Sequence, residues 1–444
     1  MRYIPHTPKD RELMLERLQI SSLDDLFSDI PESARLNRPL NLPPALSELE
    51  LRRHLRELAQ KNQSAEDLVM FLGGGFYDRF IPSTVSAIAS RGEFATAYTP
   101  YQAELSQGTL AAIYEFQTMI AGLTGTAAAQ ASMYDGASAV GEAALLALAH
   151  TKRARIVVHQ GVHPDSLAVV RTYVESRGGS VNVVRSVHEL EIVIASGDPA
   201  AAVIWQYPDM LGRIRGLESV IEIAHGHQSL AIVSSDPIAL ALLTPPGEMG
   251  ADVVVGEGQP LGNPLNYGGP TFGYFAVQAP LVRKVPGRLV GATVDGKGSR
   301  GFVLTLQARE QHIRRGKATS NICSNHSLNA LMATVYMASL GPQGIRDVAL
   351  LSTAKAHYLA QQLTNCGLTM AFPDEPYLYE FAIKVPGSVL ELNQFLLDRG
   401  YLGGFDLGRW EPEWAGIWQL ATTEKRTKEE CDGFCEEVSR WMSR

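Results

Sequence analysis

The chain has 444 residues, 45% of them hydrophobic and 19% charged, which is typical of a soluble enzyme-like protein of two or three domains. The net charge of -8 argues against broad binding of nucleic acid or of anionic membranes. Four cysteines are too few for a disulfide framework, and no stretch is typical of a signal peptide or a membrane span, so we expect a cytoplasmic protein.

Residues 1–70 are predicted to form an N-terminal helical arm. Helical patterns at 8–18 and 45–60 alternate with prolines, and the second carries leucines at a helical spacing. This segment is followed by a loop-rich stretch at 71–110.

Residues 71–326 are predicted to form a large α/β domain. Short β-branched runs alternate with helical patterns, which indicates a mostly parallel sheet covered on both faces. The expected strands are 154–160, 180–185, 201–208, 229–236, 251–259 and 272–278. The expected helices are 136–150, 163–177, 187–195 and 215–227.

The last part of the chain changes character. Residues 281–326 are basic and irregular, and we expect no regular element there. Residues 327–444 predict a smaller α+β C-terminal domain, with a strand at 377–385. Its expected helices are 327–340, 345–365, 388–399 and 427–442.

Two motifs of the large domain fit an anionic cofactor with a cationic ring. DGASAVGEA at 135–143 places small residues at a helix start, where backbone N–H groups attract phosphate; a tight strand–helix turn that binds nothing explains it too. Asp236 ends a strand, where it could hold a ring nitrogen, but Asp before Pro237 is also ordinary helix capping.

Two further stretches are rich in polar and aromatic groups. YTPYQAELSQG at 98–108 suits a site held on a loop, or a surface turn in which Ser106 caps the next helix. AREQHIRRGKATSN at 308–321 offers guanidinium and hydroxyl groups for a phosphate or carboxylate; a solvated basic face and a subunit interface are the alternatives.

The loop GEGQPLGNPLNYGGP at 256–270 has the position of an active-site loop without its chemistry. It follows an apolar strand, and open α/β enzymes bind ligands at such strand ends. Yet it holds no His, Cys, Lys or Arg, and its only charge is Glu257.

The order of these motifs, and four strings in particular, resembles the P-protein of the glycine cleavage system. The strings are YTPYQAELSQG, DGASAVGEA, GEGQPLGNPLNYGGP and AREQHIRRGKATSNIC. The resemblance covers nearly the whole chain, and the length matches the alpha subunit, subunit 1, of the form of glycine dehydrogenase (decarboxylating) that is split into two chains. The departures are Ala103 and Gly316, where the family has Pro and an acidic residue.

The resemblance implies a fold-type I pyridoxal-phosphate-enzyme-like fold without its reactive lysine. Gln259 stands at the cofactor-lysine position, and its amide cannot make the covalent bond to the cofactor. The resemblance therefore implies no catalytic residue in this chain, and pyridoxal phosphate held covalently by a partner beta subunit. The pair, or its dimer, would decarboxylate glycine and pass the aminomethyl group to the lipoyl arm of H-protein.

The resemblance also suggests which residues of this chain reach the partner's site. We expect Thr99, Tyr101, Gln102 and Glu104 to face substrate or cofactor, and no metal to be bound. The segment Thr319, Ser320 and Asn321 would contact the cofactor phosphate, and Arg309, His312 and Arg314 would support the interface. The alternatives are a purely structural partner subunit, or a free-standing nicotinamide dehydrogenase, against which the missing G-x-G-x-x-G argues.

Overall fold

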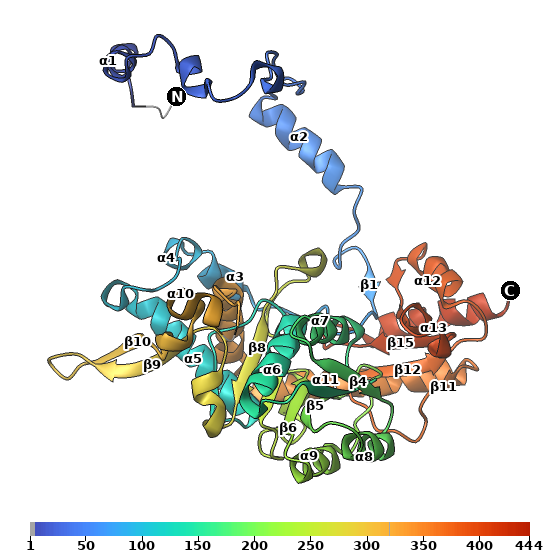
Figure 1. Cartoon of the computed structure of the whole chain (residues 1–444). Coiled ribbons are helices and arrows are strands. Elements are labelled where there is room, and N and C mark those ends of the chain that lie inside the picture. Colours follow the sequence, from blue (N-terminus) through green and yellow to red (C-terminus); the bar gives the residue numbers. More distant parts are fainter. Residues whose placement is uncertain (1–4, 319) are drawn as a thin grey trace. The chain divides into compact units, whose positions relative to one another are not determined.

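The computed structural model describes residues 5–318 and 320–444, which divide into two compact units between Gln63 and Ser64 (Figure 1). No helix of the described residues is long and apolar enough to cross a membrane. The unit that begins at Ser64 contains both the seven-stranded sheet and the C-terminal part of the chain. A domain boundary between residues 326 and 327 stays a prediction.

The described part of the first unit consists of helices and connecting turns without a core. Helices α1 (Pro8–Leu18) and α2 (Glu48–Ala59) confirm the two helices predicted there. Each begins with a capping box, in which a Thr or Ser hydroxyl and an acidic side chain three residues later satisfy the first backbone N–H groups. None of the described side chains in this unit is buried.

A seven-stranded sheet is the centre of the second unit, in the order β2-β8-β7-β6-β5-β3-β4. Strands β3 to β7 run parallel, whereas β8 pairs antiparallel with both β7 and β2. The mostly parallel sheet is therefore confirmed. The strands are β2 (Ala128–Ala129), β3 (Arg155–His159), β4 (Ser180–Val184), β5 (Ala200–Tyr207), β6 (Leu230–Ser235), β7 (Val253–Glu257) and β8 (Gly273–Val277).

Helices cover both faces of this sheet, because its central strands are apolar on both sides. Ile156 and Val158 of β3 pack with α6 and α7, whereas Val157 between them packs with the cluster on the opposite face. That second cluster includes residues of α5, α8, α9 and α11. These helices are α5 (Gln107–Thr124), α6 (Gly136–Thr151), α7 (Pro164–Glu175), α8 (Val187–Ala195), α9 (Leu217–Gly226) and α11 (Ser327–Asn365).

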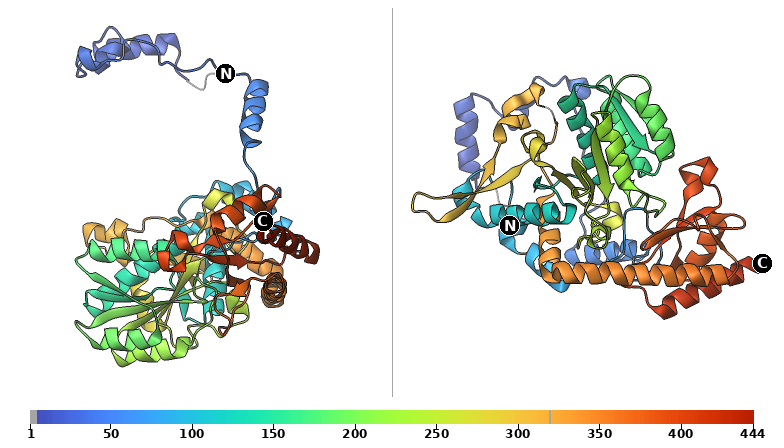
Figure 2. Two further views of the ribbon diagram at one scale, coloured as in Figure 1. Left: turned by 90° about the vertical axis from the view of Figure 1, so that its right-hand side faces the viewer. Right: turned by 90° about the horizontal axis from the view of Figure 1, so that it is seen from below.

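The long helix α11 leads from the large sheet to the C-terminal part (Figure 2). It joins the two helices predicted at 327–340 and 345–365 across a kink, where Gly341 adopts φ 64° before Pro342. An antiparallel sheet then follows in the order β11-β12-β15-β14. The remaining elements there are β11 (Thr369–Met370), β12 (Glu380–Lys384), α12 (Val389–Leu397), β13 (Tyr401–Leu402), β14 (Phe405–Asp406), β15 (Ile417–Ala421) and α13 (Lys428–Met442).

The prediction that 281–326 has no regular structure is wrong in its middle. Strands β9 (Leu289–Val294) and β10 (Arg300–Thr305) form an antiparallel hairpin that extends from the rest of the unit (Figure 1). The stretch 71–110 also contains short helices. The other elements of the unit are β1 (Val69–Met70), which pairs with β13, and α3 (Ser83–Ala89), α4 (Gly92–Ala95) and α10 (Gln311–Arg314).

Candidate functional site

A cavity of about 650 Å³ lies at the carboxyl ends of β5, β6 and β7. Ligands of open α/β enzymes bind at this edge of the sheet. Its wall also includes the starts of α6 and α7, the loop 74–77, part of the glycine-rich loop at 268–271 and the first residue of β12. The helix start and Asp236, which the sequence associated with a cofactor, thus line one cavity.

Gln259, at the predicted lysine position, does not line this cavity. Its side chain is buried and connects its own loop to the loop that contains Tyr77. Nε2 donates to the carbonyl oxygens of Tyr77 at 3.1 Å and Asn263 at 2.8 Å, and Oε1 accepts from the backbone N–H of Tyr77 at 2.9 Å. The amide is thus fully engaged in holding the framework together.

The carboxylate of Glu257 lies at the N-terminus of α6. Its Oε2 accepts from the backbone N–H of Gly136 at 2.9 Å. Its Oε1 accepts from the backbone N–H of Gln259 at 2.9 Å and from the hydroxyl of Thr271. Burial raises the pKa of Glu257 to about 7, although these donors oppose the shift.

Asp236 acts as a cap in this chain. Its Oδ1 accepts from the backbone N–H groups of Ile238 at 2.8 Å and Ala239 at 3.2 Å. Glu380, which also lines the cavity, accepts from the backbone N–H of Gly74 at 2.6 Å and from the hydroxyl of Tyr77 at 3.0 Å. Burial raises the pKa of Glu380 to about 7.

The cavity does not fit pyridoxal phosphate, the cofactor implied by the fold. None of the described residues that line it is Lys or Arg, so the wall offers no amine for the covalent bond to the cofactor and no permanently charged cation for its phosphate; His163 and His326 are the only basic side chains among these residues. Five carboxyl groups line it instead. They are Asp135, Asp165, Asp236, Glu257 and Glu380.

The predicted substrate-facing residues lie elsewhere, on an exposed loop before α5. Tyr101 is 56% exposed, Gln102 and Glu104 are exposed, and Thr99 is half-buried. Ser106 precedes α5 without a side-chain cap. Gln107 holds the loop instead, through a hydrogen bond of Nε2 to the carbonyl oxygen of Phe302 at 2.9 Å.

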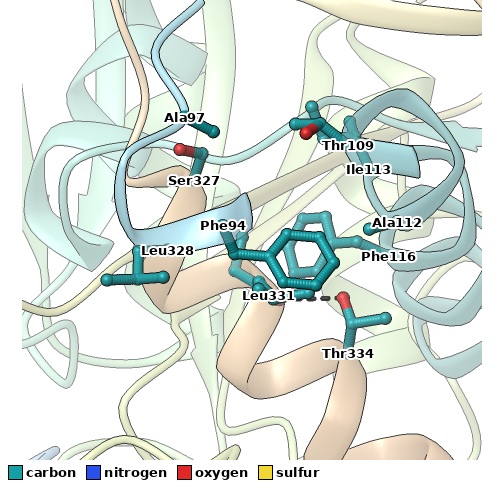
Figure 3. A pocket seen from close by; sticks show the side chains of 11 residues that line it. Phe94, Ala97, Thr109, Ala112, Ile113, Phe116, Ser327, Leu328, Leu331 and Thr334 are labelled. Atoms are coloured by element: carbon teal, nitrogen blue, oxygen red, sulfur yellow. Dashed lines mark hydrogen bonds between the residues drawn. The ribbon is translucent and has the colours of Figure 1, made fainter. Parts of the chain in front are cut away.

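The base of this loop is fixed by apolar packing, as Figure 3 shows. Phe94 lies against Phe116 of α5 and Leu331 of α11, and Ala97 lies beside Ser327, around a pocket of about 20 Å³. That volume is close to what a single water molecule needs, so this pocket is a packing feature rather than a ligand site.

The second predicted segment lies beside the loop. The rings of Tyr101 and His312 meet edge to face with centroids 6.1 Å apart, and the Arg288 guanidinium lies 5.7 Å from the Tyr101 ring. Arg309 donates to the carbonyl oxygen of Val285, and Arg314 donates from Nε to a carbonyl of its own segment, that of Ala308, at 3.1 Å. The structure thus brings two of the sequence motifs together on one surface.

The three predicted phosphate contacts differ in their surroundings. Asn321 is exposed. Ser320 is buried, and its hydroxyl accepts from the backbone N–H of Ile322 at 3.0 Å. It also lies near Glu142, whose pKa is raised to about 7 by burial and is partly lowered again by Ser320. Thr319 lies outside the described residues.

Residues 1–438 match the family described as glycine cleavage system P-protein. The chain belongs to this family. It is 50% identical over 441 residues to a probable glycine dehydrogenase (decarboxylating) subunit 1 of Geobacillus kaustophilus, covering 98% of each chain. It is also 50% identical over 443 residues to the protein of that name from Bacillus subtilis, again covering 98% of each.

A solved structure of similar sequence is that of glycine decarboxylase (P-protein) of the glycine cleavage system in inhibitor-bound form. The two are 42% identical with a TM-score of 0.89, over 99% of this chain and 100% of the other. Glutamate decarboxylase from Lactobacillus brevis is 13% identical with a TM-score of 0.68, over 93% and 96% of the two chains. The latter shows the fold alone, and the predicted fold-type I architecture is confirmed.

Proposed function

We propose that this P-protein chain is the lysine-less subunit of a two-chain glycine decarboxylase, whose chemistry takes place on pyridoxal phosphate held by the partner subunit. That cofactor acts as an electron sink while carbon dioxide leaves glycine. The aminomethyl group that remains is passed to the lipoyl arm of H-protein. Relatives named subunit 1 support the existence of a partner chain.

The position of Gln259 is the observation that carries this proposal. A cofactor-bearing chain of this fold needs an amine there, and this chain has an amide whose nitrogen and oxygen are both hydrogen-bonded to the framework. No Lys or Arg among the described residues lines the cavity beside it. We therefore infer that the cofactor is bound outside this chain.

This chain's contribution is the surface formed by the loop 98–107 and the segment 308–321. Tyr101, Gln102 and Glu104 are exposed while the loop base is fixed, which suits side chains that enter a neighbouring site. Thr99 and Tyr101 would orient substrate there and exclude water. Asn321 and the neighbouring Thr319 and Ser320 would offer donors to the cofactor phosphate.

The first unit supplies a second surface for the partner. Its described residues bury no side chain, and many large apolar side chains are exposed, including Leu49, Leu51 and Leu55 of α2. Such a density of exposed leucines is typical of a protein–protein interface. We assign this arm to the contact with the partner subunit.

The central test follows the cofactor's near-visible absorbance in the purified chain, alone and with its partner. Borohydride reduction then fixes the cofactor covalently, and peptide mapping identifies the labelled chain. We expect absorbance of bound cofactor only with the partner, and the label on the partner. A label on any lysine of this chain would overturn the assignment of Gln259.

A second test separates a contributing subunit from a purely structural one. Thr99→Ala and Tyr101→Ala in the assembled complex should lower kcat by about tenfold or more, since each removes a group that orients the reacting molecule. Thr172→Ala, an exposed threonine on α7, is the matched control and should leave kcat unchanged. Unchanged kcat in all three variants would support the structural role instead.

A further inference from the structure

The N-terminus of α6 is the place in this fold where an anion would bind, since the first backbone N–H groups of a helix lack partners within the helix. In this chain two of these groups are already bonded to carboxylates. Gly136 N–H donates to Glu257 at 2.9 Å, and Ser138 N–H donates to Asp135 at 2.7 Å. α6 has 16 residues, so its dipole is well developed.

The approach of Glu257 to the helix is built into the backbone. A side chain at Gly136 would bring its Cβ within 2.8 Å of the backbone nitrogen of Glu257, so only glycine fits there. The carboxylate is also fixed from its other side, by the N–H of Gln259 and the hydroxyl of Thr271. Three donors from three separate segments therefore converge on one side chain.

We propose that the carboxylate of Glu257 takes the place of a bound anion at the N-terminus of α6. In this position it excludes phosphate-bearing ligands from the cavity. A phosphate could enter only by displacing a tethered carboxylate whose local concentration is fixed by the fold. Once there it would still face the negative charge of Asp135, with no Lys or Arg among the described lining residues to offset it.

The test is anion rescue in the full-length chain. Glu257→Ser removes the carboxylate and frees the N–H groups of Gly136 and Gln259. Thermal midpoints are measured in chloride and in inorganic phosphate at constant ionic strength. We expect the thermal midpoint of the wild type to stay the same when phosphate replaces chloride. The midpoint of Glu257→Ser should be lower in chloride and should rise with phosphate concentration. The apparent phosphate affinity of the variant should be about tenfold or more above that of the wild type.

Glu380→Ser is the matched control, because Glu380 lines the same cavity but bonds Gly74 and Tyr77 instead of the helix. Its midpoint should fall without recovery in phosphate. If Glu257→Ser does not fold, Glu257→Asp withdraws the carboxylate by one methylene and should show a weaker rescue. Equal phosphate response in the wild type and the variant, or a folded variant that phosphate does not stabilise, would overturn the proposal.

Discussion

The replacement Gln259→Leu tests whether the residue at the lysine position is now a structural part of the framework. Leucine has a similar size but cannot form hydrogen bonds. The change removes three buried hydrogen bonds, two to Tyr77 and one to Asn263. At about 1 kcal/mol each, with an added penalty for the stranded backbone groups, the free energy of unfolding should fall by about 3–5 kcal/mol.

The assay is urea denaturation of the full chain, followed by tryptophan fluorescence. Gln361→Leu is the matched control, because Gln361 is exposed on α11 and the same substitution there should change the free energy of unfolding by about 0.5 kcal/mol or less. If both variants lose the same small amount, Gln259 is a neutral remnant and its bonds do not stabilise the loops.

The other contacts around the cavity, and the separate first unit, lead to four further expected outcomes. Gln259→Lys should leave the isolated chain unable to trap pyridoxal phosphate under borohydride, because the helix N-terminus stays bonded to Glu257; trapping at residue 259 would refute this. Because burial raises the pKa of Glu257 from 4.5 to about 7, its ionisation lowers the free energy of unfolding as pH rises between these two values. Glu142 and Glu380 have pKa values raised in the same way, so Glu257→Gln should make the fall in urea midpoint with pH shallower without abolishing it, and parallel profiles of wild type and variant would count against this. Asp236→Ala should cost about 1 kcal/mol as a lost cap and leave kcat of the complex unchanged, whereas a large loss of kcat would restore a catalytic role. Deleting residues 1–63 should shift the unfolding free energy of the rest by about 0.5 kcal/mol or less but abolish co-purification with the partner, and retained co-purification would contradict the role of the arm.

The sequence predicted the parts of the fold whose signals are local. The strands β3 to β8 lie within a residue or two of the expected bounds. For β3 and β5 to β8 the reason is that a strand buried on both faces is largely apolar, whereas the edge strand β4 is partly exposed. The hairpin β9–β10 was missed although Asp295-Gly296 lies between β-branched runs, a common hairpin signal.

The candidate site was harder to predict because its decisive contacts are long-range. Glu257 stood out in the sequence as the only charge of its loop, but its partner Gly136 is 121 residues away. Likewise Gln259 could be recognised as a missing lysine, whereas its bonds to Tyr77 span 182 residues. The residue type at position 259 indicates that it cannot hold the cofactor covalently. Only the folded structure shows that Gln259 and Glu257 form hydrogen bonds to distant segments of the chain.

The carboxylate of Glu257 at the N-terminus of α6 also has a thermodynamic consequence for this chain. A protein that binds a diffusible ligand gains stability by mass action, so its melting temperature follows the ligand's concentration. A side chain that occupies the place of a ligand is always present in the folded chain, so its occupancy does not depend on any concentration in solution. If Glu257 takes the place of a bound anion at α6, the stability of this chain does not follow the concentration of any free phosphate-bearing ligand.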